Sequence, residues 1–358
     1  MNSQRIDGLC ADNSYTFLYG PSTQPHLILS RRLINSILRT ILPAGKNDHA
    51  GTENILTSTP IPRRIPFADK INPENRKIDW AVIFFIGTIH LGALASPWTF
   101  SWSGLVIFLI LSWMGGGLGI TMGFHRLLTH QSFKCPKWFY YFVTICGCLQ
   151  WQGGPIRWVG THRLHHKHSD HEEDPHTPKH GFNWAHMFWC MFKDHEDFKP
   201  YDAAKDLQKD KILVWIDKYF VIFQFILAAG LYVGGYFFGG QGTEGHMLAL
   251  SWIVWGIFLR TACAYHGTWF VNSATHTWGY RNFKTTDDSR NSWWVALLSF
   301  GEGWHNNHHA FQRSAAHGLK WWEFDMTYLT IRLLGLVGIA KDIVKPTEAQ
   351  MEQKNIPA

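Results

Sequence analysis

Three short clusters of histidine stand out in a 358-residue chain that carries 21 histidines in all. They are HRLLTH (125–130), HRLHH (162–166) and HNNHH (305–309). Their eight histidines are His125, His130, His162, His165, His166, His305, His308 and His309. In the second and third clusters the spacing i, i+3, i+4 puts three imidazoles on one face of a helix, where they could serve one metal ion or straddle two. Eight imidazoles exceed what one four- or five-coordinate ion can use, so we expect a pair of ions.

A fourth stretch, NSATH (272–276), adds to these clusters because Asn272 and His276 are i, i+4 neighbours on a helix. His276 would supply a ninth ring nitrogen, and the Asn272 amide could hold a water molecule. By contrast, HEEDPH (171–176) does not match the zinc-protease motif HExxH, since its second histidine comes five residues after the first. The acidic residues Asp170, Glu172, Glu173 and Asp174 could orient ligand imidazoles or could simply be solvated.

Four long apolar stretches predict membrane-spanning helices that would position these residues. They cover residues 80–98, 103–124, 219–240 and 247–270. Each is close to the length of about 20 residues that crosses a bilayer as a helix. The stretch 138–149 is shorter and predicts a buried or re-entrant helix. The sequence therefore predicts an all-α integral membrane protein with four transmembrane helices in two hairpins.

The distribution of positive charge predicts the topology of these helices. Of the 33 lysines and arginines, all but Arg260 lie in residues 1–79, 125–218 and 272–358, and the loops 96–102 and 241–246 contain none. Because cytoplasmic segments of membrane proteins are rich in Lys and Arg, both hairpins and all the histidine clusters are expected to face one side. This topology explains the net charge of +6 without a nucleic-acid partner. Arg260 is costly in lipid and should face the protein interior or reach the interface.

The ends of the chain differ from the apolar region between them. Residues 1–79 form a polar, Pro-rich extension, and 343–358 form a C-terminal tail, so the catalytic domain is expected to span 80–342. Within the extension, residues 27–42 have the pattern of a basic amphipathic helix, which suits a membrane surface, a targeting peptide or a solvated tail. The six cysteines include no CxxC pair, which favours a reducing compartment.

Chemistry narrows the choice of metal. Imidazole binds zinc, copper, iron and nickel, so the ligand type leaves the metal open. A metal pair at the membrane face is placed to act on a lipid chain, and attack on an unactivated C–H bond needs a redox metal and O2. A centre of two iron ions meets that need. A membrane di-iron hydroxylase would share this pattern, whereas a metal transporter would be expected to carry ligands near mid-membrane, where His90, His266 and Arg260 are the candidates.

Four motifs together resemble the membrane fatty acid desaturases, most closely the cyanobacterial and plastid delta-9 acyl-lipid desaturases. The motifs are GFHRLLTHQSF (123–133), WVGTHRLHHKHSDHEEDPH (158–176), TWFVNSATH (268–276) and GEGWHNNHHAFQ (301–312). The resemblance implies four transmembrane helices, a cytosolic helical cap and a di-iron site over an acyl tunnel. It assigns the ligand role to the eight clustered histidines and His276, with Asn272 acting through a water molecule.

The resemblance also implies a substrate and partners. Animal acyl-CoA desaturases carry a charged pair before the second histidine cluster, where this chain has Gly160 and Thr161, so a lipid-bound acyl chain is favoured over acyl-CoA. No His-Pro-Gly-Gly haem signature appears, which implies a separate electron donor, ferredoxin for a cyanobacterial or plastid relative. The histidines would face the cytosol or stroma, at the thylakoid or plasma membrane of a cyanobacterium or at a chloroplast membrane.

The sequence thus predicts an oxygen-dependent desaturase that makes a cis double bond, at the delta-9 position, in a saturated acyl chain. An acyl-CoA desaturase and a fatty acid hydroxylase remain alternatives. Gln152, Trp158 and Trp269 are candidates for lining the acyl tunnel. Trp113, twelve residues before His125, could limit its depth.

Overall fold

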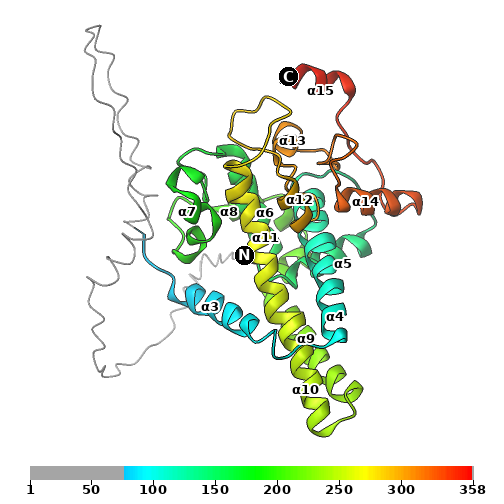
Figure 1. Ribbon diagram of the computed structural model, residues 1–358. Coiled ribbons are helices and arrows are strands. Elements are labelled where there is room, and N and C mark those ends of the chain that lie inside the picture. Colours follow the sequence, from blue (N-terminus) through cyan, green and yellow to red (C-terminus); the bar gives the residue numbers. More distant parts are fainter. Residues whose placement is uncertain (1–75, 357–358) are drawn as a thin grey trace, which may run out of the picture. The chain divides into compact units, whose positions relative to one another are not determined.

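The computed structural model describes residues 76–356, and every regular element in that range is a helix. The extended pairings there are isolated bridges, such as Ile78 with Phe192. The amphipathic stretch 27–42 lies outside the described residues. The helices are α3 (Trp80–Leu94), α4 (Trp102–Ser112), η2 (Trp113–Thr129), α5 (Lys137–Cys148), α6 (Pro155–His168), η3 (Pro178–His180), α7 (Phe182–His186), η4 (Phe188–Met191), α8 (Pro200–Ala203), η5 (Leu207–Lys209), α9 (Lys211–Phe238), α10 (Gly242–Ile253), η6 (Val254–Leu259), α11 (Arg260–Ser273), η7 (Ala274–His276), α12 (Trp293–Leu298), α13 (His305–Ala310), α14 (Met326–Leu336) and α15 (Glu348–Lys354) (Figure 1).

Three continuous helical segments are long and apolar enough to cross a membrane: Trp102–Thr129, Lys211–Phe238 and Gly242–His276. They correspond to three of the four predicted spans, although the one predicted at 219–240 ends at Phe238. At 1.5 Å per residue, a 28-residue helix is about 42 Å long, which exceeds the hydrocarbon thickness of about 30 Å. The first and third segments carry histidines of the predicted site near their C-terminal ends, His125 in the first and His276 in the third.

Helix α3 occupies the position of the remaining predicted span but is shorter than the stretch 80–98. Its 15 residues begin after Asp79, whose side chain accepts hydrogen bonds from two backbone amides of the first turn. The helix ends at Leu94, and turns follow over residues 95–99. A residue before proline is disfavoured in helical geometry, and Ser96 precedes Pro97. Helix α3 packs against η6 and α11. Its large exposed side chains, such as Phe84 and Leu91, are apolar.

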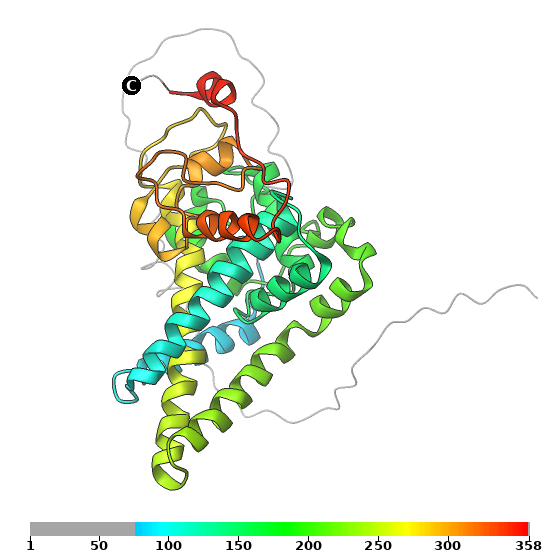
Figure 2. The same ribbon diagram turned by 90° about the vertical axis from the view of Figure 1, so that its right-hand side faces the viewer.

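The loops that join these helices lie at one end of the described region, and the histidine-bearing elements lie at the other. Figure 2 shows the connections α3–α4 and α9–α10 at its lower end, with α12, α13 and α15 at the upper end. Helix α9 presents apolar side chains outward, among them Phe225, Ile226 and Phe237. Such an exposed apolar surface suits contact with lipid.

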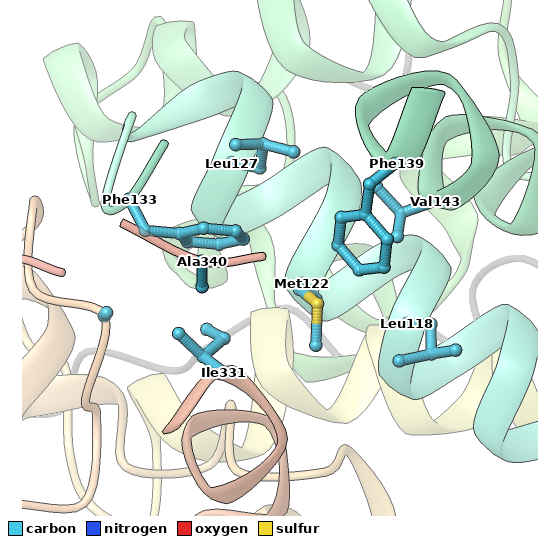
Figure 3. Close-up of a cluster of buried hydrophobic side chains, with 9 residues drawn as sticks. Leu118, Met122, Leu127, Phe133, Phe139, Val143, Ile331 and Ala340 are labelled. Atoms are coloured by element: carbon cyan, nitrogen blue, oxygen red, sulfur yellow. The ribbon is translucent and has the colours of Figure 1, made fainter. Parts of the chain in front are cut away.

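Helix η2 is a π-helix that is buried almost throughout its 17 residues. It crosses α5 closely, since a Cβ added at Gly119 would lie 2.3 Å from the backbone nitrogen of Gly147. An apolar cluster fills the space among η2, α5, α14 and the loops around them (Figure 3). It comprises Leu118, Met122, Leu127, Phe133, Phe139, Val143, Ala315, Ile331 and Ala340. This packing fixes the part of η2 that carries His125 and His130.

Two further features support the histidine-bearing end. Arg260 faces the protein interior, where its guanidinium donates to the carbonyl oxygens of Gly256 (2.6 Å) and Leu149 (2.7 Å). The C-terminal residues are hydrogen bonded to the rest of the chain: the Val344 carbonyl accepts from the Ala315 amide at 2.8 Å, and Ile356 N donates to the carbonyl of Asn282 at 2.9 Å.

Candidate metal centre

The π-helical geometry of η2 explains how the first histidine cluster can act as a unit. In an α-helix, residues five apart point about 140° away from each other at 3.6 residues per turn. A π-helix closes i→i+5 hydrogen bonds instead, and His130 N donates to the carbonyl oxygen of His125 at 3.1 Å. The two imidazoles consequently lie on one face, with ring centroids 4.8 Å apart. Sequence reasoning recognised the pair but supplied no geometry for it.

The nine predicted histidines form two groups in the structure, and within each group the ligand atoms lie within 4.8 Å of one another. The five-histidine group consists of His125, His130, His162, His166 and His308. The four-histidine group consists of His165, His276, His305 and His309. The spacing i, i+3, i+4 on α6 and on α13 thus divides between two sites rather than serving one.

On both helices the two histidines four residues apart enter the same group, and the remaining histidine enters the other group. On α6 the i, i+4 pair His162 and His166 enters the five-histidine group, while His165 enters the other. On α13 the i, i+4 pair enters the four-histidine group, while His308 crosses to the five-histidine group. Residues four apart on an α-helix differ by about 40° in direction, whereas adjacent residues differ by about 100°.

Imidazole nitrogens face each other at short distances within both groups. The Nε2 atom of His308 lies 3.1 Å from that of His125 and 2.9 Å from that of His166. In the four-histidine group, the Nε2 atoms of His305 and His276 are 3.0 Å apart.

Carboxylates fix the opposite side of four of these rings. Nδ1 of His125 lies 2.6 Å from Glu302. Three members of the four-histidine group have such a partner: His165 with Asp174 at 2.9 Å, His276 with Asp170 at 3.0 Å and His309 with Asp287 at 2.7 Å. A carboxylate accepts hydrogen bonds, so Nδ1 carries the proton and the Nε2 lone pair faces the group. This arrangement is the usual outer support of metal-bound histidine.

The protonation of the rings tests whether a metal ion fits. Burial, together with the neighbouring imidazoles, holds the pKa of His162, His166 and His305 well below the ordinary value for histidine. These rings are therefore neutral at physiological pH. Neutral nitrogens with converging lone pairs repel each other unless a cation lies between them, and imidazole is a preferred ligand of iron, zinc and copper. Both groups could accordingly hold a metal ion.

The electrostatic support includes residues that the sequence did not single out. Glu302 contacts His125, Arg126 and His317, the last through Nδ1 at 3.0 Å. The buried Arg126 guanidinium is held in turn by Asp325 at 3.0 Å. Glu302 stands within GEGWH, three residues before His305, so that spacing was an available signal. Asp287 lies in a loop, where no periodic pattern pointed to it.

A cavity of about 640 Å³ reaches the centre from the apolar side and is lined by residues of α3, α6, α9 and α11. Gln152, Trp158, Trp269 and Asn272 line it, and Trp113 is not among its lining residues. Gln152 accepts from the Trp158 indole at 3.2 Å and donates to Thr268 at 2.9 Å. The Trp158 ring stacks on His162, with centroids 5.2 Å apart. The cavity wall therefore continues into the five-histidine group.

The fold and the site together define an all-helical membrane protein with a histidine centre able to hold metal ions. The sequence model of the family described as fatty acid desaturase matches residues 98–333, more than half of the chain. The chain belongs to this family, and it is an oxidoreductase that desaturates fatty acyl chains.

Characterised relatives extend this assignment. Over 273 residues the chain is 48% identical to the sn-1 stearoyl-lipid 9-desaturase of Anabaena variabilis. The aligned region covers 75% of this chain and 94% of that protein. It is 44% identical over 275 residues to the sn-2 palmitoyl-lipid 9-desaturase of Nostoc sp. (strain 36), with 75% and 91% covered. It is 40% identical over 297 residues to the acyl-CoA C20 Delta5-desaturase of Anemone leveillei, with 80% and 91% covered.

Proposed function

We propose that the protein is an oxygen-dependent delta-9 desaturase acting on an acyl chain esterified in a membrane lipid, with one iron ion in each histidine group. The observation that carries the proposal is that the apolar cavity reaches the histidine centre, since its lining includes His162 of the five-histidine group and Asn272. All nine histidines would be ligands. Asn272 would complete the four-histidine group through a water molecule, since that group has one imidazole fewer.

The chain's residues would position the substrate and control its surroundings. Apolar side chains such as Phe85, Phe225 and Tyr265 would hold the acyl chain and exclude water from the reacting carbons. Bound iron would supply the redox chemistry by which O2 and two electrons, with two protons, become two waters as two hydrogens leave the acyl chain. The carboxylates would keep the Nε2 atoms of their histidines directed at the ions.

The cavity's polar lining favours a lipid ester over acyl-CoA. Arg157 lines it but makes a two-point ion pair with Asp194, at 2.7 and 3.0 Å, which neutralises its charge. Thr161 contributes a neutral hydroxyl. At Gly160, a Cβ would lie 1.8 Å from the carbonyl oxygen of Pro200, so packing of α8 excludes a charged side chain there. The charged pair that animal acyl-CoA desaturases carry at these two positions is therefore missing from this wall, which favours a lipid ester even though Arg76 and Lys193 also line the cavity.

For the membrane arrangement, we infer four spans in two hairpins, with α3 as the additional span and the remaining helices forming a cap. The catalytic domain would cover 80–342. The histidine groups would face the cytosol or stroma, where a soluble donor such as ferredoxin can supply electrons.

Expression in a host that lacks this activity tests the proposal. With iron and a reductant supply, lipids are expected to gain a cis monounsaturated acyl chain with the double bond at carbon 9. Separate analysis of the glycerolipid and acyl-CoA pools would show where the product first appears. An alcohol instead of an alkene would identify a hydroxylase. An unchanged lipid profile, with iron-loaded protein in the membrane, would overturn the proposal.

A further inference from the structure

A polar hollow of about 550 Å³ opens on the five-histidine group, separate in its lining from the apolar cavity. Its lining consists of Thr129, His130, Gln131, Arg163, His166, Lys167, Gln312 and Arg313. Among these described residues there is neither an acidic nor a hydrophobic side chain. His130 and His166 belong to the hollow and to the five-histidine group at once. Two rings of the histidine centre therefore form part of the wall of this hollow.

The hollow is positively charged. Arg163 is paired with Asp206 at 2.5 and 3.0 Å, so its charge is compensated. Lys167 and Arg313 are exposed, and neither makes an ion pair with any residue in the range 76–356. Unpaired cations around a concave surface attract an anionic partner and speed its association.

The proposed reaction requires such a partner. Each double bond formed with O2 consumes two electrons that neither the acyl chain nor the side chains supply. The apolar cavity would be filled by the substrate, so a reductant has to approach the centre from another direction. Within the described residues, the hollow offers an approach whose lining includes two rings of the five-histidine group beside cations.

We propose that this hollow is the docking surface for the electron donor, a small acidic protein that carries one electron at a time. This inference rests on the desaturase function proposed above. Two reduced donor molecules dock in succession and each is oxidised by one electron. These two electrons with two protons, together with the two hydrogens that leave the acyl chain, reduce O2 to two waters. His166, one of the residues that line the hollow, has a buried Nδ1 atom for which the described chain offers no hydrogen-bond partner.

The test compares the iron-loaded full chain with the double variant Lys167→Glu/Arg313→Glu, using a reduced, acidic [2Fe–2S] ferredoxin as the probe. Reversal of both charges is expected to raise the KM for ferredoxin at least about tenfold, to weaken its binding in surface plasmon resonance by a similar factor, and to flatten the dependence of rate on salt. Activity with dithionite as reductant is expected to be unchanged.

Lys284→Glu/Lys341→Glu is the matched control, because it makes the same charge change at exposed residues outside the hollow. An unaltered KM in the hollow variant, or an equal rise in the control, would overturn the docking proposal. Absence of product from the wild type with either reductant would instead contradict the desaturase function. If the double variant accumulates poorly, Lys167→Gln and Arg313→Gln are each expected to raise KM about threefold, and wild-type values for both would reject the proposal.

Discussion

The two histidine groups are built from the same side chain but supported differently. In the four-histidine group, three of the four rings contact a carboxylate. In the five-histidine group, within the described part of the chain, His125 alone does, and its partner Glu302 is shared with Arg126. The four-histidine group therefore has fewer imidazoles but more supporting carboxylates. The five-histidine group has more imidazoles but fewer supporting carboxylates.

This difference indicates how far the positive charge of each bound ion would be compensated. Carboxylates raise the basicity of the histidines they contact and offset the charge of a bound cation. An ion in the five-histidine group would keep more of its positive charge. The basic hollow opens on that same group, so an incoming electron would meet the less compensated ion first.

Removal of one ring from each group should have the largest effect. His308→Ala and His305→Ala are both expected to abolish desaturation. His305→Ala should lose about half of the bound iron, because three imidazoles hold an ion poorly, whereas His308→Ala leaves four and should retain more. Iron per chain and fatty acid product would be measured in parallel. His171→Ala, at an exposed histidine, is the control with full activity. Equal losses of iron in the two variants would contradict the proposed difference between the groups.

Neutralisation of a supporting carboxylate should come next. Asp287→Asn and Glu302→Gln are each expected to lower iron affinity about 10- to 100-fold. Glu302→Gln should also lower the thermal unfolding midpoint, because Arg126 is fully buried and loses one of its two carboxylates, at a cost of about 3 kcal/mol. Iron retention against a chelator and unfolding in detergent would measure the two effects. A larger loss of thermal stability in Asp287→Asn would contradict the argument.

The two groups should also release iron at different pH values, the four-histidine group at the higher pH. Asp174 raises the pKa of His165 above its ordinary value, whereas burial keeps the pKa of His130, His166 and His308 well below it. As pH falls, a proton therefore reaches Nε2 of His165 first and competes with the metal there. In the wild type, iron should therefore leave in two steps as pH falls. The step that belongs to the four-histidine group, identified by its absence from His305→Ala, should have its midpoint about one pH unit above the other. The opposite order would refute this.

The smallest effect is expected at Asn272. If it supports the four-histidine group through water, Asn272→Ala should reduce iron retention and activity only a few-fold. Cys263→Ala, at an exposed position on the same helix, provides the control and should match the wild type. A complete loss of iron would show that Asn272 has a stronger role than the water-mediated one proposed.

Sequence reasoning anticipated much of this architecture. Three predicted spans correspond to helices long enough to cross a membrane, and the stretch 138–149 corresponds to the short, half-buried helix α5. The helix predicted at 80–98 ends at Leu94 instead. The apolar pattern alone extends past Pro97 and did not indicate that the proline would end the helix. Asp170 and Asp174 were recognised as candidate orienting groups. Asp287 and His317 were missed because contacts made through loops leave no periodic trace. Glu302 was missed although its position three residues before His305 was an available signal.

The sequence by itself determined which nitrogens are available and that they come in helical pairs. Composition and the spacing i, i+3, i+4 are properties of the chain alone, and the apolar stretches follow from the cost of burying polar groups in lipid. Only the tertiary structure decided that His165 separates from His162 and His166, and that His308 separates from His305 and His309. That choice depends on the direction from which neighbouring helices approach, because residues on one helical face still diverge by tens of degrees and each ring joins the site it points toward.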